Sequence, residues 1–212
     1  MPTHPVPPIP ATCAHRPTVG GRVAPYINVH LADGGVDFRR QHRTRVEEVL
    51  ERRWCQVCAT PLRHPIVLLG GPHALKQLLF KEPPLHPECA VYTTRACPMV
   101  AGQLTEFAHG LSVAETRRGK KCFEPGCGCA GWVSTDPGGD RGPAHPWYAV
   151  YARNYRVVDG TDGQVLGALV LPAEVLRVRL VSRPGEGRCW QDAPDALADY
   201  EPPILSLPPR PA

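Results

Sequence analysis

The sequence "ERRWCQVCATPLRHP", residues 51–65, contains the first half of a metal-ligand pattern. It holds two cysteines two residues apart, Cys55 and Cys58, and a second pair with the same spacing, His86 and Cys89, follows after 27 residues. Structural zinc takes four thiolate or imidazole ligands in a tetrahedron, and this spacing lets one tight turn aim both side chains of a pair at the ion. The sequence therefore predicts that these four residues hold one zinc ion.

The sequence around the two pairs predicts the local structure of the site. The first pair would lie on a knuckle, and "PIVLL" (65–69) would form a strand that ends at Gly70 and Gly71. That strand and the segment near 75–80 would form a β-hairpin. A helix would then begin near Pro87, since proline favours the first helical turn. This order resembles a treble-clef zinc finger over residues 54–97.

Other interpretations of the first pair remain open. A thioredoxin-like redox pair needs a helix directly after the motif, and Pro61 and Pro65 disfavour one there. HNH nucleases also contain treble clefs, but the asparagine they usually need is missing, because Asn28 and Asn154 lie far from the finger. A surface His86 beside buried thiols, and a degenerate nuclease, are the remaining alternatives.

A second cysteine cluster lies in "KKCFEPGCGCAGW" (120–132). Its three thiols predict a second metal site, and zinc is the simplest occupant. An iron–sulfur cluster, which takes four thiolates, is the less favoured one, and a loop with free thiols is the alternative to both. The predicted ligands are Cys122, Cys127, Cys129 and, as the fourth, Cys97, with His109, His145 or Cys13 as other candidates for the fourth position. Cys13 and His15 are otherwise interpreted as part of an ordered N-terminal arm.

Composition limits the class of protein. The chain has 212 residues, 26 prolines, 20 glycines and 9 cysteines. An odd number of cysteines rules out complete intramolecular disulfide pairing, so metal binding or thiol chemistry is favoured. No apolar run approaches the length of a membrane span, and the N-terminus lacks the pattern of a secretory signal. We therefore expect a cytoplasmic protein with no membrane partner.

The positive charge is mostly arginine. The net charge is only +4, but 20 arginines stand against 4 lysines, a bias that a GC-rich coding sequence also produces. Residues 38–54 are predicted to form a helix, with an apolar stripe at Val46, Leu50 and Trp54. Because arginine suits bidentate phosphate contacts, the candidate contacts to nucleic acid or a protein partner are Arg39, Arg40, Arg43, Arg45, Arg52 and Arg53.

The second half predicts an antiparallel sheet. "WYAVYARNYRVV" (147–158) and "QVLGALVL" (164–171) flank a turn and are typical of a hairpin, and residues 174–182 would form a third strand. We expect a Pro-rich arm over 1–19, a single domain over 20–185 and a flexible Pro-rich tail over 186–212. Within the domain, the finger (54–97) is followed by a Cys-rich loop (115–146) and the β-sheet (147–182).

Three segments, "RRWCQVCATPL", "EPPLHPECAVY" and "RACPMVAG", together resemble a family of small, uncharacterised, cysteine-rich actinobacterial proteins. In that family an Arg-rich helix leads into a CQVC pair, and a CA-x-Y segment follows. The resemblance supports the first zinc site and implies nothing about an activity.

The sequence therefore predicts an α+β fold, in which a treble-clef-like zinc-binding unit packs with a C-terminal antiparallel β-sheet between Pro-rich flexible termini. The predicted function is that of a non-enzymatic zinc-binding module that binds nucleic acid or a protein partner. The alternatives are an enzyme, either a degenerate nuclease or a thiol-dependent hydrolase using Cys97 or the 122–129 loop, and a redox or metal sensor using the second cluster.

Overall fold

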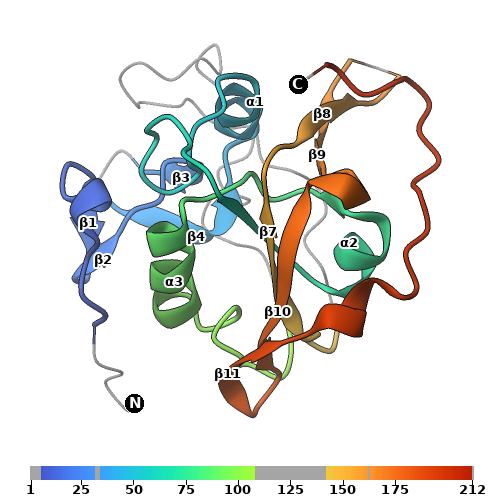
Figure 1. Cartoon of the computed structure of the whole chain (residues 1–212). Helices are drawn as coiled ribbons and strands as arrows, with labels where there is room; N and C mark the ends of the chain where they lie inside the picture. The colour runs from blue at the N-terminus through green and yellow to red at the C-terminus, as the bar shows by residue number, and fades with distance from the viewer. Residues whose placement is uncertain (1–5, 32–33, 108–141, 162, 212) are drawn as a thin grey trace.

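The computed structural model describes residues 6–31, 34–107, 142–161 and 163–211. In this part of the chain the fold is mixed α/β with antiparallel sheets (Figure 1). None of the described helices is both long and apolar enough to cross a bilayer. The elements, in chain order, are η1 (Ala11–Cys13), β1 (Thr18–Val19), β2 (Arg22–Val23), β3 (Asn28–His30), β4 (Val36–Gln41), α1 (Arg43–Glu51), β5 (Ile66–Gly70), α2 (Pro72–Gln77), β6 (Leu79–Phe80), α3 (Pro87–Ala96), β7 (Trp147–Ala152), β8 (Arg156–Asp159), β9 (Val165–Leu169), η2 (Pro172–Glu174), β10 (Val175–Arg183), β11 (Gly187–Asp192) and η3 (Pro194–Leu197).

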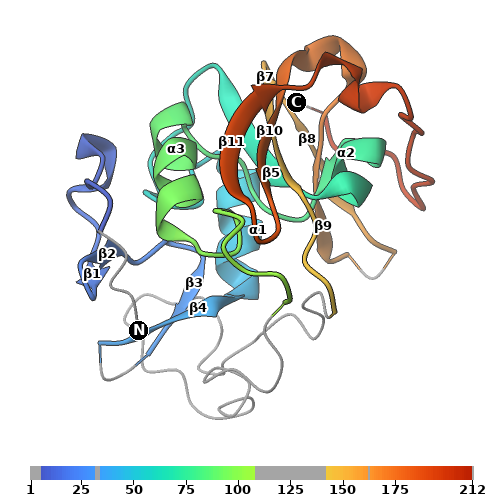
Figure 2. The same ribbon diagram turned by 90° about the horizontal axis from the view of Figure 1, so that it is seen from below.

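A central four-stranded sheet in the order β11-β10-β7-β5 organises the molecule. Figures 1 and 2 show α3 on one side of it and α2 on the other. Strand β5 is buried along its whole length, and successive side chains of a strand point to opposite faces. Val67 and Leu69 therefore pack in one core with α3 and the N-terminal segment, while Ile66 and Leu68 pack in a second core with α1 and α2.

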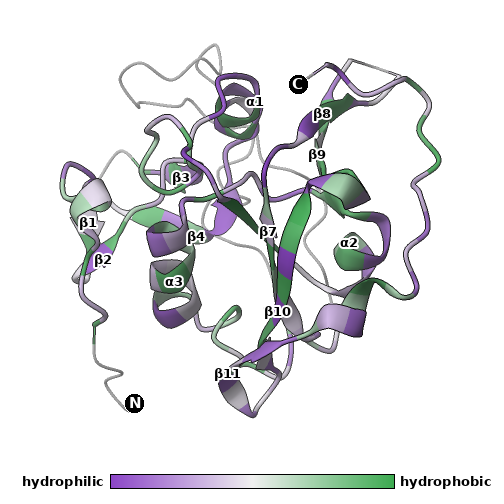
Figure 3. Cartoon of the chain, viewed as in Figure 1, coloured by the Kyte–Doolittle hydropathy of each residue, from purple (hydrophilic) through white to green (hydrophobic). Residues whose placement is uncertain are grey.

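Hydropathy follows this layering. Figure 3 shows hydrophobic residues along β10 and on parts of α2 and α3. On β10, Val178 packs in the core on the α2 side, and Val181 packs in the core on the α3 side. Both faces of the central sheet are therefore covered, which accounts for the apolar character of "IVLL" on both faces of β5.

The hairpin expected between the two ligand pairs is not formed. Strand β5 pairs with β7, in the register Leu68 to Val150, while β6 pairs with β9 in a separate sheet of order β6-β9-β8. Pro72 begins α2, which separates β5 from β6. The predicted hairpin is wrong because a short apolar segment does not indicate which strand it pairs with.

The predicted helix over 38–54 is only half correct. Residues 36–41 form β4, which pairs with β3, and helix α1 begins at Arg43 and ends at Glu51. Val49 and Leu50 are the buried apolar residues of α1, and Val46 lies at its margin. The strand prevails over residues 38–41 because β3 supplies backbone partners for it, which the helical period could not reveal.

The predicted strand over 147–158 is two strands in different sheets. β7 ends at Ala152, and β8 begins at Arg156 and pairs with β9. The chain turns between them, where the Asn154 side chain accepts a hydrogen bond from the Tyr155 amide at 2.9 Å. The hairpin of β8 and β9 and the third strand, β10, are confirmed.

The C-terminal residues pack against the body of the protein, although the sequence predicted a flexible tail. β11 pairs with β10, so the sheet extends beyond residue 182. Arg210 donates to both carboxylate oxygens of Asp159, each at 2.6 Å, and to Glu51 at 2.9 Å. Its amide also donates to Val157 O on the edge strand β8. Helix α3 ends at Ala96, before Pro98, and the described residues directly after Pro98 form turns.

Candidate metal centre

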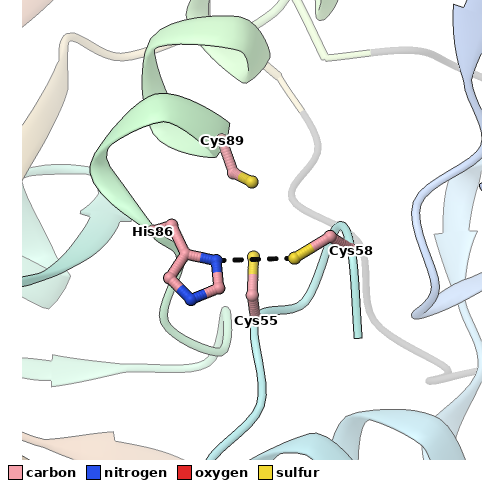
Figure 4. A group of neighbouring side chains, drawn as sticks. All are labelled: Cys55, Cys58, His86 and Cys89. Atoms are coloured by element: carbon pink, nitrogen blue, oxygen red, sulfur yellow. Dashed lines mark hydrogen bonds between the residues drawn. The ribbon is translucent and has the colours of Figure 1, made fainter. Parts of the chain in front are cut away.

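Four donor atoms meet at one point, from Cys55, Cys58, His86 and Cys89 (Figure 4). They all lie within 4.8 Å of one another. The three cysteines have no exposed surface, and His86 is 1% exposed. This is the set of residues that the spacing of the two pairs predicted, now seen as a single buried Cys₃His group.

The first pair lies on a tight knuckle between α1 and β5. The segments before and after the turn are joined by backbone hydrogen bonds. Leu62 N donates to Arg53 O at 2.8 Å, and Cys55 N donates to Thr60 O at 2.9 Å. Ala59 closes the turn with a left-handed φ of 56° and donates its amide to Cys55 O. The closed turn directs both thiols to the same side.

The second pair lies at the start of α3. His86 is the N-cap residue, Pro87 is the first residue of the helix, and Cys89 lies in the first turn. The segment is fixed from the other side, because Leu85 exchanges two backbone hydrogen bonds with Val67 of β5, at 2.8 and 2.9 Å. In the metal-free cluster the pKa of Cys89 is raised, first by its side-chain hydrogen bond with Cys13, and the positive end of the helix dipole acts in the opposite direction.

The His86 ring is oriented as in a metal ligand. Its Nε2 lies 2.9 Å from Pro61 O, and its Nδ1 faces Cys58 Sγ at 3.4 Å. A carbonyl oxygen only accepts, so Nε2 carries a hydrogen, and Nδ1 is the nitrogen that faces the thiols and would present its lone pair to a metal. Ligating histidines ordinarily donate their second N–H to a carboxylate or a backbone carbonyl, and Pro61 O fills that role here.

In the metal-free cluster the donor groups share protons through their hydrogen bonds. The pKa of His86 is raised to about 10 by side-chain hydrogen bonds, first with Cys55 and then with Cys58. The pKa of Cys58 is lowered because its thiolate accepts hydrogen bonds, the largest effect coming from Cys13, and burial raises the pKa of Cys55. A metal ion takes the place of the protons that the buried donors share.

Three thiolates and an imidazole form a donor set of the zinc type. Tetrahedral ligands at about 2.3 Å from zinc lie roughly 3.8 Å from one another. The four donors all lie within 4.8 Å of one another, and Cys58 Sγ lies 3.4 Å from His86 Nδ1, so the group is compact enough for one ion. Thr60 Oγ1 lies 3.1 Å from Cys58 Sγ and gives that ligand an outer partner. The residues present therefore fit a closed four-ligand site.

The second predicted site falls mostly outside the described residues, because Cys122, Cys127, Cys129 and His109 lie between residues 107 and 142. Cys97 is described and caps the C-terminus of α3, where burial raises the pKa of its thiol. His145 packs between the rings of Phe107 and Trp147, each centroid 5.2 Å away.

Cys13, one candidate for the fourth ligand of that second site, lies at the first centre. Its Sγ is 3.6 Å from Cys89 Sγ. Sequence reasoning missed this contact because Cys13 is separated from the finger by some forty residues without a motif. The only available signal was the pairing of Cys13 with His15 in "TCAHRP".

The six candidate arginines do not form one helical stripe. Arg39 and Arg40 lie on β4, and Arg45 is buried, donating to Tyr26 O at 2.9 Å. Arg53 reaches Asn154 and stacks on the Tyr155 ring. Two others are exposed and are paired with glutamates of the same helix, Arg43 with Glu47 at 3.0 Å and Arg52 with Glu48 at 3.3 Å.

Comparisons with known proteins gave no relative: no protein-family model, no curated protein and no solved structure matches the chain. The geometry of this centre is therefore the main indication of function.

Proposed function

We propose that this chain is a non-enzymatic zinc-binding module whose Cys₃His centre cross-links the knuckle to helix α3. The observation that carries the proposal is the complete burial of four protein donors around one point, with the His86 ring held by Pro61 O. Catalytic zinc keeps a coordination position open for water, whereas structural zinc is closed by four protein ligands. The donor set supports the structural role.

We further propose that residues 54–97 are a modified treble clef. The order of a knuckle followed by a ligand-bearing helix supports this assignment. The unit departs from the usual pattern because β5 and β6 belong to different sheets. The finger thus shares both its strands with the rest of the protein, one with each sheet.

The surface around α1 is the proposed contact to a partner, and its charges favour a protein over nucleic acid. Arg43 and Arg52 already pair with Glu47 and Glu48, so a phosphate would have to displace a carboxylate from each. Phosphate-binding surfaces gain their affinity from unneutralised positive charge. A protein surface carrying both signs of charge fits the paired arrangement.

The metal proposal is tested by elemental analysis of the purified chain. We expect zinc in wild type, its loss from this centre in Cys55→Ser, and wild-type content in Cys189→Ser, which removes a cysteine of β11. A second equivalent of zinc that persists in Cys55→Ser would support the predicted second site. Wild-type protein that binds neither zinc nor cobalt would reject the proposal.

The partner proposal is tested with duplex DNA and single-stranded RNA at about 50 and 200 mM salt, a range over which phosphate contacts weaken steeply. We expect no salt-sensitive binding to either. A salt-sensitive complex that Arg43→Glu and Arg52→Glu abolish, and that the exposed control Arg188→Glu retains, would replace the protein partner by nucleic acid.

The proposed compartment is reducing, as in the cytoplasm. Six cysteines are free thiols in the described part of the chain, four of them buried at or beside the centre. Thiolate ligands must stay reduced to hold a metal.

A further inference from the structure

The N-terminal arm brings a fifth sulfur to the metal centre. Cys13, the last residue of η1, has no exposed surface, and its Sγ lies 3.6 Å from Cys89 Sγ. Thr12 Oγ1 lies at the same distance from that sulfur. Cys13 thus belongs to the same core as Cys55, Cys58 and Cys89, although it is not one of the four converging donors.

The arm is held in this place by contacts to both halves of the centre. His15 Nε2 lies 2.8 Å from Cys58 O on the knuckle. Further along, Val23 N donates to the hydroxyl of Tyr92 on α3 at 2.8 Å. The contact between Cys13 and Cys89 is therefore part of an ordered interface between the arm, the knuckle and α3.

A tetrahedral ion takes four ligands, so Cys13 is left over when the centre is filled. Its sulfur keeps its lone pairs, while metal binding would occupy a lone pair on each of the other three sulfurs. Of the five sulfur and imidazole groups at this centre, Cys13 is thus the one that would hold no bond to the metal. A disulfide has a sulfur–sulfur bond of about 2.05 Å, which an approach of about 1.5 Å from the observed contact would reach.

We propose that Cys13 and Cys89 form an oxidation site that empties the metal centre, an inference that rests on the proposed zinc function. A peroxide oxidises the Cys13 thiol to a sulfenic acid and is reduced to water. The Cys89 thiolate then attacks that sulfur, its bond to the metal breaks, and the departing hydroxide takes up a proton to become a second water. The two cysteines lose two electrons together, and these reduce the peroxide.

The disulfide leaves three of the four ligands. Cys55, Cys58 and His86 then share the ion with water, which weakens its binding and allows a chelator to remove it. At the same time the new bond ties the arm covalently to α3, between residues that already touch. The oxidised protein would thus exchange a metal cross-link for a disulfide cross-link at the same place.

The experiment treats the zinc-loaded full chain with hydrogen peroxide, follows zinc release with a chromogenic chelator, and maps disulfides by mass spectrometry of peptides. In wild type we expect a Cys13–Cys89 disulfide to form in step with zinc release. In Cys13→Ser that disulfide is lost, and the peroxide-dependent release slows. Cys189→Ser, the matched control, should behave as wild type.

Three outcomes would overturn the proposal: a Cys55–Cys58 disulfide as the first product, unchanged zinc release in Cys13→Ser, or release without any disulfide at Cys13. Zinc content measured before oxidation separates this failure from failure of the proposed function. If Cys13→Ser does not fold, Cys13→Ala serves to measure the slowed zinc release, and diamide treatment of the wild-type chain shows whether the Cys13–Cys89 disulfide forms; a map without that disulfide overturns the proposal.

Discussion

At the scale of single residues, His86 shows how one side chain is fixed for its role. One ring nitrogen is committed to Pro61 O, which leaves the other facing the thiols. The knuckle thus supplies two of the four donors from its side chains, and its backbone orients the imidazole that is a third. The convergence of these four donors could be predicted from the sequence, since the spacing within each pair is local. The roles of Pro61 and Cys13 could not, because neither follows from spacing within a pair.

Replacing His86 tests whether the fourth position tolerates another zinc ligand. We expect His86→Cys to retain zinc, since thiolate and imidazole both complete tetrahedral sites. His86→Ala should lose more than the roughly 10–100-fold in affinity that removal of an outer-shell partner costs. Competition with a chelator measures both, and the cobalt-loaded His86→Cys variant should gain thiolate charge-transfer absorbance. Equal affinity of His86→Ala and wild type would contradict a ligand role.

Tyr155 links α1 to the turn between β7 and β8. Its hydroxyl is buried and donates to Leu50 O at 2.7 Å. We expect Tyr155→Phe to lower the free energy of unfolding by about 1 kcal/mol at pH 7, because Leu50 O loses a partner. Urea unfolding measures the change, with Tyr148→Phe as the control.

The pH dependence of that difference follows from the pKa of Tyr155. Burial raises it from 10.0 to about 12 in the folded protein. A raised pKa means that the neutral hydroxyl is favoured on folding. Its contribution is complete below pH 10 and is lost as the pH rises through 12. Wild type and Tyr155→Phe should therefore approach one another in stability over that range, and a constant difference would contradict the assignment.

At the scale of elements, the strands show what a sequence pattern can and cannot specify. The turn residues after β8 and the alternation in β10 are local signals, and both elements were predicted. The pairing of β5 with β7 was not predicted. β7 lies far along the chain, and a short apolar segment does not specify its partner strand. Residues 38–41 likewise form a strand although their sequence has a helical period, because β3 provides backbone hydrogen-bond partners for β4.

Gly167 tests the small sheet. This residue of β9 has a φ of 154°, and a Cβ there would lie 2.2 Å from the backbone oxygen of Phe80 in β6. We expect Gly167→Ala to push β6 away from β9 and to cost more than about 2 kcal/mol of stability. Gly163→Ala, where φ is 76° and nothing lies within 4 Å of the new Cβ, should cost only the backbone strain of about 1 kcal/mol. Equal losses in thermal or urea unfolding would contradict the close approach.

At the scale of the whole molecule, two groups of contacts join distant parts of the chain. The buried Cys₃His group joins the knuckle to the start of α3 on one face of the central sheet. On the other side, Arg210 of the C-terminal segment forms ion pairs with Glu51 of α1 and Asp159 of β8. The core between them is continuous across β5, β7 and β10, since these strands contribute to both apolar clusters.

Removing the metal should loosen one face of the molecule before the other. We expect chelation to increase amide hydrogen exchange in the knuckle and the first turn of α3, with a smaller effect on β8 and β9, because the ligands lie in the core on the α3 side. Mass spectrometry of exchanged peptides measures this. A uniform increase over the whole described chain would instead indicate that metal loss unfolds the protein globally.

Arg210→Ala should free the C-terminal segment. The variant loses a bidentate ion pair with Asp159 and an ion pair with Glu51. It retains the hydrogen bond from its backbone amide to Val157 O. We expect faster proteolytic cleavage near residues 202–209 with little change in melting temperature, since Arg210 is 41% exposed and exposed ion pairs contribute little. Arg188→Ala is the control, and unchanged cleavage would contradict this role of Arg210.

The pairing of β5 with β7 also has a consequence during synthesis. A ribosome completes both ligand pairs, and so the whole metal centre, well before it reaches residue 147. Throughout that interval the apolar strand "IVLL" lacks its neighbour on one edge, and an unpaired apolar strand edge is a template for aggregation. Association of apolar surfaces weakens on cooling. The yield of folded protein should therefore depend on growth temperature as well as on metal supply, because zinc cannot shield an edge that only the later half of the chain covers.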